Sequence, residues 1–95
     1  MLSPKPVEFR GTALDDLRAF PVSVRREAGY QLHQVQHGHE PDDWKPMAAV
    51  GSGVREIRIR DAAGGFRIIY IAKFADVVYV LHCFQKKTRP RKRKI

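Results

Sequence analysis

The sequence predicts one α+β domain in which two N-terminal helices pack on a small antiparallel sheet. Apolar residues recur at helical spacing between residues 13 and 36. Residues 54–87 contain three runs rich in β-branched and aromatic residues, with turn residues between them. The chain has 95 residues, 43% of them hydrophobic, which indicates one globular domain near the lower size limit of a self-sufficient core.

The N-terminal segment predicts a short strand and a short helix. Lys5–Phe9 reads as an edge strand, because Pro4 and Pro6 lack a backbone donor and only an edge tolerates that loss. Thr12 is the expected N-cap of the helix that follows. The apolar side of this helix consists of Leu14, Leu17 and Phe20, and Pro21 ends it.

A second helix is expected from about Ser23 to about Gln36, with Gly38 as its C-terminal cap. Its apolar stripe consists of Val24, Ala28, Leu32 and Val35. His33 and His37 lie four residues apart, but the acids in reach are only Glu40, Asp42 and Asp43. Because a protein metal site usually needs three or four ligands, we expect no metal site and no cofactor.

Residues 40–53 are predicted to form a loop in which Trp44 and Met47 close one end of the core. Gly51-Ser52-Gly53 offers backbone N–H groups to a phosphate, but it leads into a strand rather than a helix. It therefore matches no phosphate-binding fingerprint, and a simple turn is the preferred interpretation.

Three consecutive strands are expected at residues 54–60, 66–74 and 77–85, with turns at 61–65 and 75–76. Strict alternation puts Glu56, Arg58 and Arg60 on one face of the first strand. The same rule groups Arg67, Ile69, Ile71 and Lys73 on the second strand, and His82 with Val78, Val80, Phe84 and Lys86 on the third. A single cleft requires these faces to lie on the same side of the sheet.

The charge is concentrated in the C-terminal half. Residues 1–53 hold six Lys/Arg against seven Asp/Glu, whereas residues 54–95 hold twelve against three. This asymmetry favours a polyanion or an acidic protein as partner, and a merely solvated surface is the alternative. Residues 86–95 include seven basic residues, which either contact phosphates or remain solvated.

One cysteine, Cys83, excludes an internal disulfide and fits a reducing compartment. Its apolar neighbours indicate a buried packing residue rather than a nucleophile. No run is long enough for a membrane span and the N-terminus lacks a secretory pattern, so a cytoplasmic protein is expected.

The polar residues of the strands are of the types that can bind and cleave a phosphodiester. RNA cleavage through its own 2′-hydroxyl needs a proton acceptor, cations for the phosphorane and an acid, but no metal. His82 is the best proton carrier near neutral pH, and Glu56 is an alternative. Arginines suit bidentate phosphate contacts and lysines act as point charges. Tyr70 and Phe84 either stack on a base or pack in the core. A catalytic cleft and a plain binding face both remain open.

Four segments together are similar to a known family: residues 42–47 (DDWKPM), 51–61 (GSGVREIRIRD), 66–70 (FRIIY) and 82–88 (HCFQKKT). They resemble the phage-derived, HigB-like branch of the RelE/ParE toxin superfamily, over about residues 6–88. The resemblance implies a type II toxin with helices on a curved antiparallel sheet. It places a toxin domain at residues 1–88 and a basic tail at 89–95.

RelE-like members of the superfamily cut mRNA in the ribosomal A site, and ParE-like members poison DNA gyrase. The resemblance implies a metal-independent, ribosome-dependent endoribonuclease whose partners are mRNA, rRNA and a small helix-turn-helix antitoxin. The expected catalytic residues are Arg67, His82, Arg58 and Glu56. The expected RNA-binding residues are Arg60, Lys73, Lys86, Lys87 and Arg89.

The chain departs from this branch after residue 88. Related sequences usually continue as a lysine-rich helix, whereas Pro90 intervenes here and the sequence ends at Ile95. The resemblance therefore does not extend to substrate or antitoxin contacts made by that helix. A gyrase inhibitor and an inactive prophage remnant that binds antitoxin or nucleic acid are the alternatives.

Overall fold

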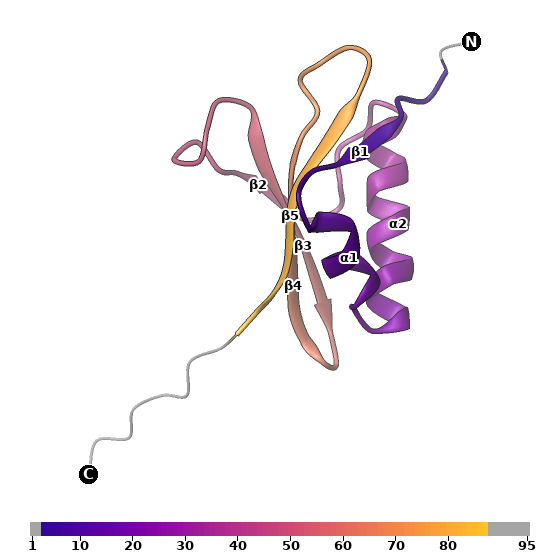
Figure 1. The fold of residues 1–95 in the computed structure, drawn as a ribbon, viewed down its shortest axis with the longest axis vertical. Coiled ribbons are helices and arrows are strands. Elements are labelled where there is room, and N and C mark those ends of the chain that lie inside the picture. Colours follow the sequence, from indigo (N-terminus) through magenta and orange to yellow (C-terminus); the bar gives the residue numbers. More distant parts are fainter. Residues whose placement is uncertain (1–2, 88–95) are drawn as a thin grey trace.

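In the computed structural model, which describes residues 3–87, two helices cover one face of a five-stranded sheet (Figure 1). The elements are β1 (Val7–Phe9), α1 (Ala13–Arg18), α2 (Val22–Gln36), β2 (Trp44–Pro46), β3 (Val54–Asp61), β4 (Gly64–Ile71) and β5 (Val78–Lys86). The strand order is β1-β5-β4-β3-β2. The predicted α+β class with two helices is confirmed.

The sheet is mixed, so the expectation of a wholly antiparallel sheet is wrong. Neighbouring strands from β2 to β5 pair antiparallel, but β1 precedes both helices and pairs parallel with β5. Two backbone bonds extend this pairing: Val78 N–H donates to Pro6 O and Arg10 N–H donates to Val80 O, both at 2.9 Å. The predicted edge position of this strand is confirmed.

The long helix α2 ends as the sequence predicts. Gly38 adopts a φ of 82°, which is strained for residues with a side chain. Its N–H donates to Val35 O at 3.0 Å, and His39 N–H donates to Gln34 O at 2.9 Å. These two bonds form a Schellman motif, which satisfies the last carbonyls of the helix.

The core lies between the helices and the sheet. The predicted stripe of α2 is buried together with the inward residues of β3, β4 and β5. Those inward residues are Ile57, Ile59, Phe66, Ile68, Tyr70, Val78, Val80 and Cys83. The core therefore uses one face of the strands and leaves the other face uncovered by helices.

Residues 44–46 form the edge strand β2 rather than part of a loop, and Trp44 is only half-buried. Trp44 and Met47 do not belong to the core, so their predicted role is wrong. The indole stacks instead under the guanidinium of Arg55, 4.2 Å from the ring centroid. Arg58 N–H donates to Asp43 O at 2.9 Å, which extends the pairing of β2 with β3.

The strand boundaries differ from the predicted ones near the turns. The β3–β4 turn contains only residues 62 and 63, because Asp61 and Gly64 are already paired. Strand β4 ends at Ile71 rather than at residue 74, and residues 72–77 connect it to β5. The predicted basic tail, residues 89–95, lies outside the described residues.

A β-bulge in β5 reverses the predicted alternation of that strand. Ile69 pairs with His82 but Tyr70 pairs with Val80, so Leu81 is an extra residue. Val80 therefore points into the core, whereas His82 shares a face with Arg67 and Ile69. The prediction that His82 lies on the face of Val80 is wrong, because strict alternation does not allow for a bulge.

Candidate nucleic-acid interface and active site

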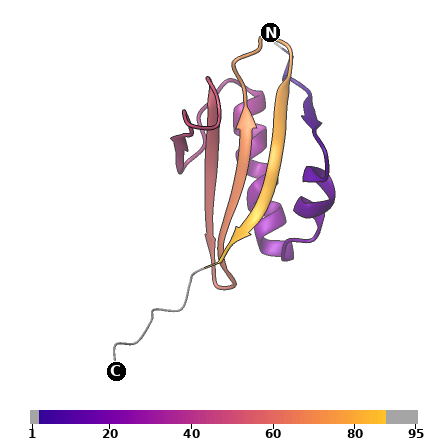
Figure 2. The same cartoon turned by 60° about the vertical axis from the view of Figure 1, so that its left-hand side comes forward.

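The sheet face opposite the helices, here called the open face, carries most of the predicted site residues. Figure 2 looks toward this face, with the helices behind the strands. The strand register arranges its side chains in four rows. From the β4–β5 connection toward the β3–β4 turn, the rows are Val54–Ile71–Tyr79–Glu8, Glu56–Ile69–His82, Arg58–Arg67–Phe84 and Arg60–Gly65–Lys86.

Glu56 is the centre of the charged part of the open face. Its Oε1 lies 3.5 Å from Arg58 Nε and 3.6 Å from Arg67 Nε. The residue is only 6% exposed, and a carboxylate so buried needs a compensating charge. Two guanidiniums around one carboxylate leave an excess of one positive charge, which favours an anionic group above them.

Arg67 and Arg58 differ in their access to a ligand. The Arg67 side chain is 10% exposed, and its Nη1 donates to Phe66 O at 3.1 Å. A Cβ at Gly65 would lie 3.3 Å from that Nη1, so the absence of a side chain at Gly65 makes room for the guanidinium. The Arg58 side chain is 31% exposed. Arg67 is therefore held in place by Glu56 and by the carbonyl of Phe66, and Arg58 is the more accessible cation.

His82 lies across β4 from Glu56. Both residues pair with Ile69 from opposite sides, so their Cα atoms lie two strand spacings apart, about 10 Å. The His82 ring is exposed and stacks with Phe84, with 5.1 Å between the ring centroids and 26° between the planes. The two groups that can move a proton thus lie on either side of Ile69, in the row next to the arginine pair.

The other predicted RNA-binding residues are only partly gathered there. Arg60 and Lys86 lie on either side of Gly65 in the next row, and Lys87 is exposed directly after β5. Lys73 lies at the opposite end of the open face, so it does not join this group. Arg89 lies outside the described residues.

Lys73 belongs instead to a cluster that the sequence prediction missed. Phe74 and Tyr79 meet edge to face, with 5.7 Å between their centroids and 85° between their planes. Arg10 lies 5.6 Å from the Tyr79 centroid, and Lys73 lies 5.5 Å from the Phe74 centroid. The available signal in the sequence was the pair of aromatic residues Phe74 and Tyr79 near predicted strand ends. Strict alternation did not predict that Tyr79 shares a face with His82, because it does not allow for the bulge at Leu81.

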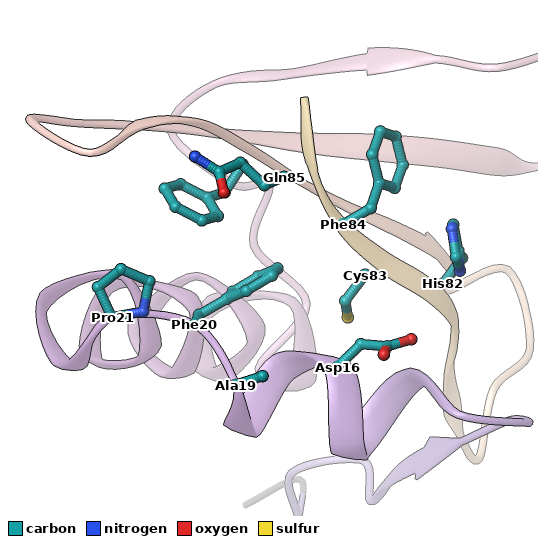
Figure 3. Close-up of a pocket in the computed structure, with 9 residues that line it drawn as sticks. Asp16, Ala19, Phe20, Pro21, His82, Cys83, Phe84 and Gln85 are labelled. Atoms are coloured by element: carbon teal, nitrogen blue, oxygen red, sulfur yellow. The ribbon is translucent and has the colours of Figure 1, made fainter. Parts of the chain in front are cut away.

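A cavity of about 370 Å³ lies beside the C-terminal half of β5, next to α1. Figure 3 shows Cys83 and Asp16 pointing toward each other there, with Phe84 on the other side of the strand. Burial, assisted by the Asp16 carboxylate, raises the pKa of the Cys83 thiol to about 12. The thiol is neutral at physiological pH, so the predicted packing role fits and a nucleophilic role does not.

Tyr70, one of two alternatives for base stacking, is fully buried in the core. Its hydroxyl makes no hydrogen bond within residues 3–87. Burial raises the pKa of the Tyr70 hydroxyl above its usual value. The positive charge of the nearby Arg55 partly opposes this rise. Phe84, the other alternative, is half-exposed on the open face and remains available.

The rings of His33 and His37 lie 4.1 Å apart between centroids, and His37 Nδ1 is 2.9 Å from His33 O. Across residues 3–87, no three His, Cys, Asp or Glu side chains are grouped closely enough to hold a metal ion. Neither helix in this part of the chain has the length and apolar character of a membrane span.

Comparison with known proteins gives one match. Neither a curated protein nor a solved structure matches the chain. The model of one protein family, described as Phage derived protein Gp49-like (DUF891), matches residues 15–94. This match begins inside α1 and covers α2, β2 to β5 and every expected catalytic residue. On that basis, the chain belongs to the phage-derived Gp49-like family.

Proposed function

We propose that this protein is the toxin of a type II toxin–antitoxin pair and cuts mRNA on the ribosome without a metal. The observation that carries the proposal is the placement of Glu56 between Arg58 and Arg67, with His82 on the other side of β4. Membership of a phage-derived family supports it, because the sequence also resembles the phage-derived, HigB-like branch of the RelE/ParE toxins.

The geometry suits in-line cleavage by the RNA 2′-hydroxyl. Glu56 takes the 2′-OH proton, and the 2′-oxygen forms a bond to phosphorus. The bond from phosphorus to the 5′-oxygen breaks, and protonated His82 gives its proton to that oxygen. The products are a 2′,3′-cyclic phosphate and a 5′-hydroxyl. In-line displacement needs base and acid on opposite sides of the phosphorus, and these two groups flank β4 on opposite sides.

The arginines supply the electrostatic part of the reaction. Arg58 contacts the phosphate from the more exposed position, and Arg67 faces the growing negative charge from below. Arg60, Lys86 and Lys87 hold neighbouring phosphates without reading the sequence. The resemblance further supports two partners: a helix-turn-helix antitoxin that neutralises the toxin, and the ribosome, which presents the mRNA.

The test is primer extension on cellular mRNA after brief induction without antitoxin. The wild type is compared with Arg58→Ala and Arg67→Ala, and with Arg26→Ala as a matched control, because Arg26 is exposed on α2 behind the sheet. We expect new cleavage ends in translated regions for wild type and control. We expect a loss of at least about a hundredfold for the two site variants, as when a transition-state donor is removed.

Three results contradict the proposal. Full cleavage by Arg58→Ala and Arg67→Ala, with folding checked by circular dichroism, excludes this site. Growth arrest with intact mRNA excludes the endoribonuclease, and DNA damage in the same cells assigns the arrest to gyrase inhibition. A wild type that has no effect on growth identifies an inactive remnant.

A further inference from the structure

Phe74 and Tyr79, here called the aromatic corner, lie at the end of the open face away from the arginine pair. Phe74 follows β4 and is 42% exposed. The two rings are nearly perpendicular, so they form two walls of one corner. A large exposed aromatic ring is costly to leave in water, which makes the corner a candidate contact surface.

The corner lies on the same face as the arginine pair. Tyr79 pairs with Ile71, and Ile71 lies two residues beyond Ile69 on β4. The bulge at Leu81 then places Tyr79, His82 and Phe84 on one face of β5. From the Tyr79 row to the Arg67 row, the distance is two strand repeats, about 13 Å. The rings of Tyr79, His82 and Phe84 therefore all lie on the open face between the corner and the charged rows.

Two cations border the corner. The Arg10 guanidinium contacts the Tyr79 ring and also pairs with Glu8 at 3.1 Å, on an exposed part of the surface. The Lys73 ammonium lies by the Phe74 ring, and its stem packs on Gly53, where a Cβ would lie 2.8 Å from Lys73 Cδ. The absence of a side chain at Gly53 thus leaves room for Lys73 beside the aromatic corner.

We propose that the aromatic corner is a stacking subsite for one base of single-stranded RNA that runs along β5, with Arg10 and Lys73 contacting its flanking phosphates. This inference deepens the proposed function, on which it rests. Rings bordered by cations match the two components of a nucleotide, a flat base and an anionic backbone. A purely apolar protein segment would offer no anionic group to Lys73, whereas Arg10 already pairs with Glu8, so the charge pattern favours RNA.

The experiment measures binding of a fluorescein-labelled, single-stranded 2′-O-methyl oligonucleotide, which lacks the free 2′-hydroxyl needed for cleavage. Anisotropy gives Kd for wild type, Tyr79→Leu and Phe74→Leu at low salt. We expect each Leu variant to bind about tenfold more weakly, because stacking is lost while apolar bulk remains. Tyr79→Phe keeps the ring and is expected to bind like the wild type.

Tyr30→Leu is the matched control, because Tyr30 is 53% exposed on α2, on the other side of the sheet. Its Kd should equal that of the wild type. Unchanged binding by Tyr79→Leu and Phe74→Leu, or no binding by the wild type, overturns the subsite. The same Leu variants are also tested for capture of the cognate antitoxin. If they bind RNA like the wild type but no longer capture the antitoxin, the subsite is overturned and the corner is a protein-docking surface.

The proposed function can fail separately. If Arg58→Ala still cuts mRNA while Tyr79→Leu loses RNA affinity, the catalytic assignment is wrong and the subsite stands. If Arg58→Ala abolishes cleavage while Tyr79→Leu binds RNA normally, the catalytic assignment stands and the subsite is wrong.

Discussion

Glu56 has a structural role that its contacts show and a chemical role that we propose. Arg58 and Arg67 are held together through this residue, which is buried although it lies on the open face. An apolar residue there would leave two guanidiniums to repel each other. The same contacts keep its carboxylate next to the cations that would hold a phosphate.

We predict that Glu56→Gln separates these roles. The amide keeps the shape but cannot accept a proton as a base, so mRNA cleavage on purified ribosomes should slow by roughly a hundredfold or more. The loss of a buried counter-charge should also lower the free energy of unfolding by up to about 3 kcal/mol. Urea denaturation gives the stability, and cleavage is compared where both proteins are fully folded. Cleavage at the wild-type rate would leave Glu56 a purely structural role.

Helix α2 is the element whose ends and stripe follow most directly from local sequence. Its apolar residues recur toward the sheet, and its C-terminus closes at the glycine that can adopt a positive φ. It also anchors the following loop: Gln31 Nε2 donates to Asp42 Oδ2, and Asp42 N–H donates to Gln31 Oε1, both at 2.9 Å. The loop thereby delivers β2 to the edge of β3.

Gly29, inside α2, and Gly38, just after its C-terminus, give predictions of opposite sign. Gly29 lies inside the helix, and a Cβ there meets nothing within 4 Å, so Gly29→Ala should raise the free energy of unfolding by about 0.5–1 kcal/mol. Gly38 has a φ of 82°, so Gly38→Ala should lower it by about 1 kcal/mol. Urea denaturation at one pH measures both. A stabilising Gly38→Ala would contradict the left-handed cap.

At the scale of the whole molecule, the helices and the cluster of positive charge lie on opposite faces of the sheet. The net charge is +8, and the helices cover one face of the sheet while Arg58, Arg60, Arg67 and Lys86 lie on the other. This separation gives the protein one strongly basic face, which steers an anionic polymer toward the Glu56 row.

We predict a salt-dependent affinity for single-stranded RNA. Each neutralised phosphate contributes about −0.7 to the slope of log Kobs against log salt concentration. Arg60→Ala and Lys86→Ala should each make the slope shallower by about that amount, measured with the uncleavable oligonucleotide. Arg25→Ala, on exposed α2, removes the same charge and should leave the slope unchanged. Equal slopes for all variants would show that the two residues do not contact phosphates.

Much of the fold could be predicted from sequence. The helices, the alternation of β3 and the edge strand at the N-terminus depend on local periodicity and on proline and glycine, which act within a few residues. The parallel pairing of β1, the strand β2 and the true place of Trp44 depend on partners distant in the chain. For those elements, the local sequence pattern gives no information about which strand or side chain becomes the neighbour.

The candidate site divides in the same way. The sequence by itself determined which chemical groups are present and that Glu56, Arg58 and Arg60 share a face, because a strand repeats every two residues. Only the tertiary structure decided that His82 joins them and that Arg67 is buried against Glu56. The physical reason is one extra residue, Leu81: a bulge forms where two strands pair, and it changes the face of every side chain beyond it.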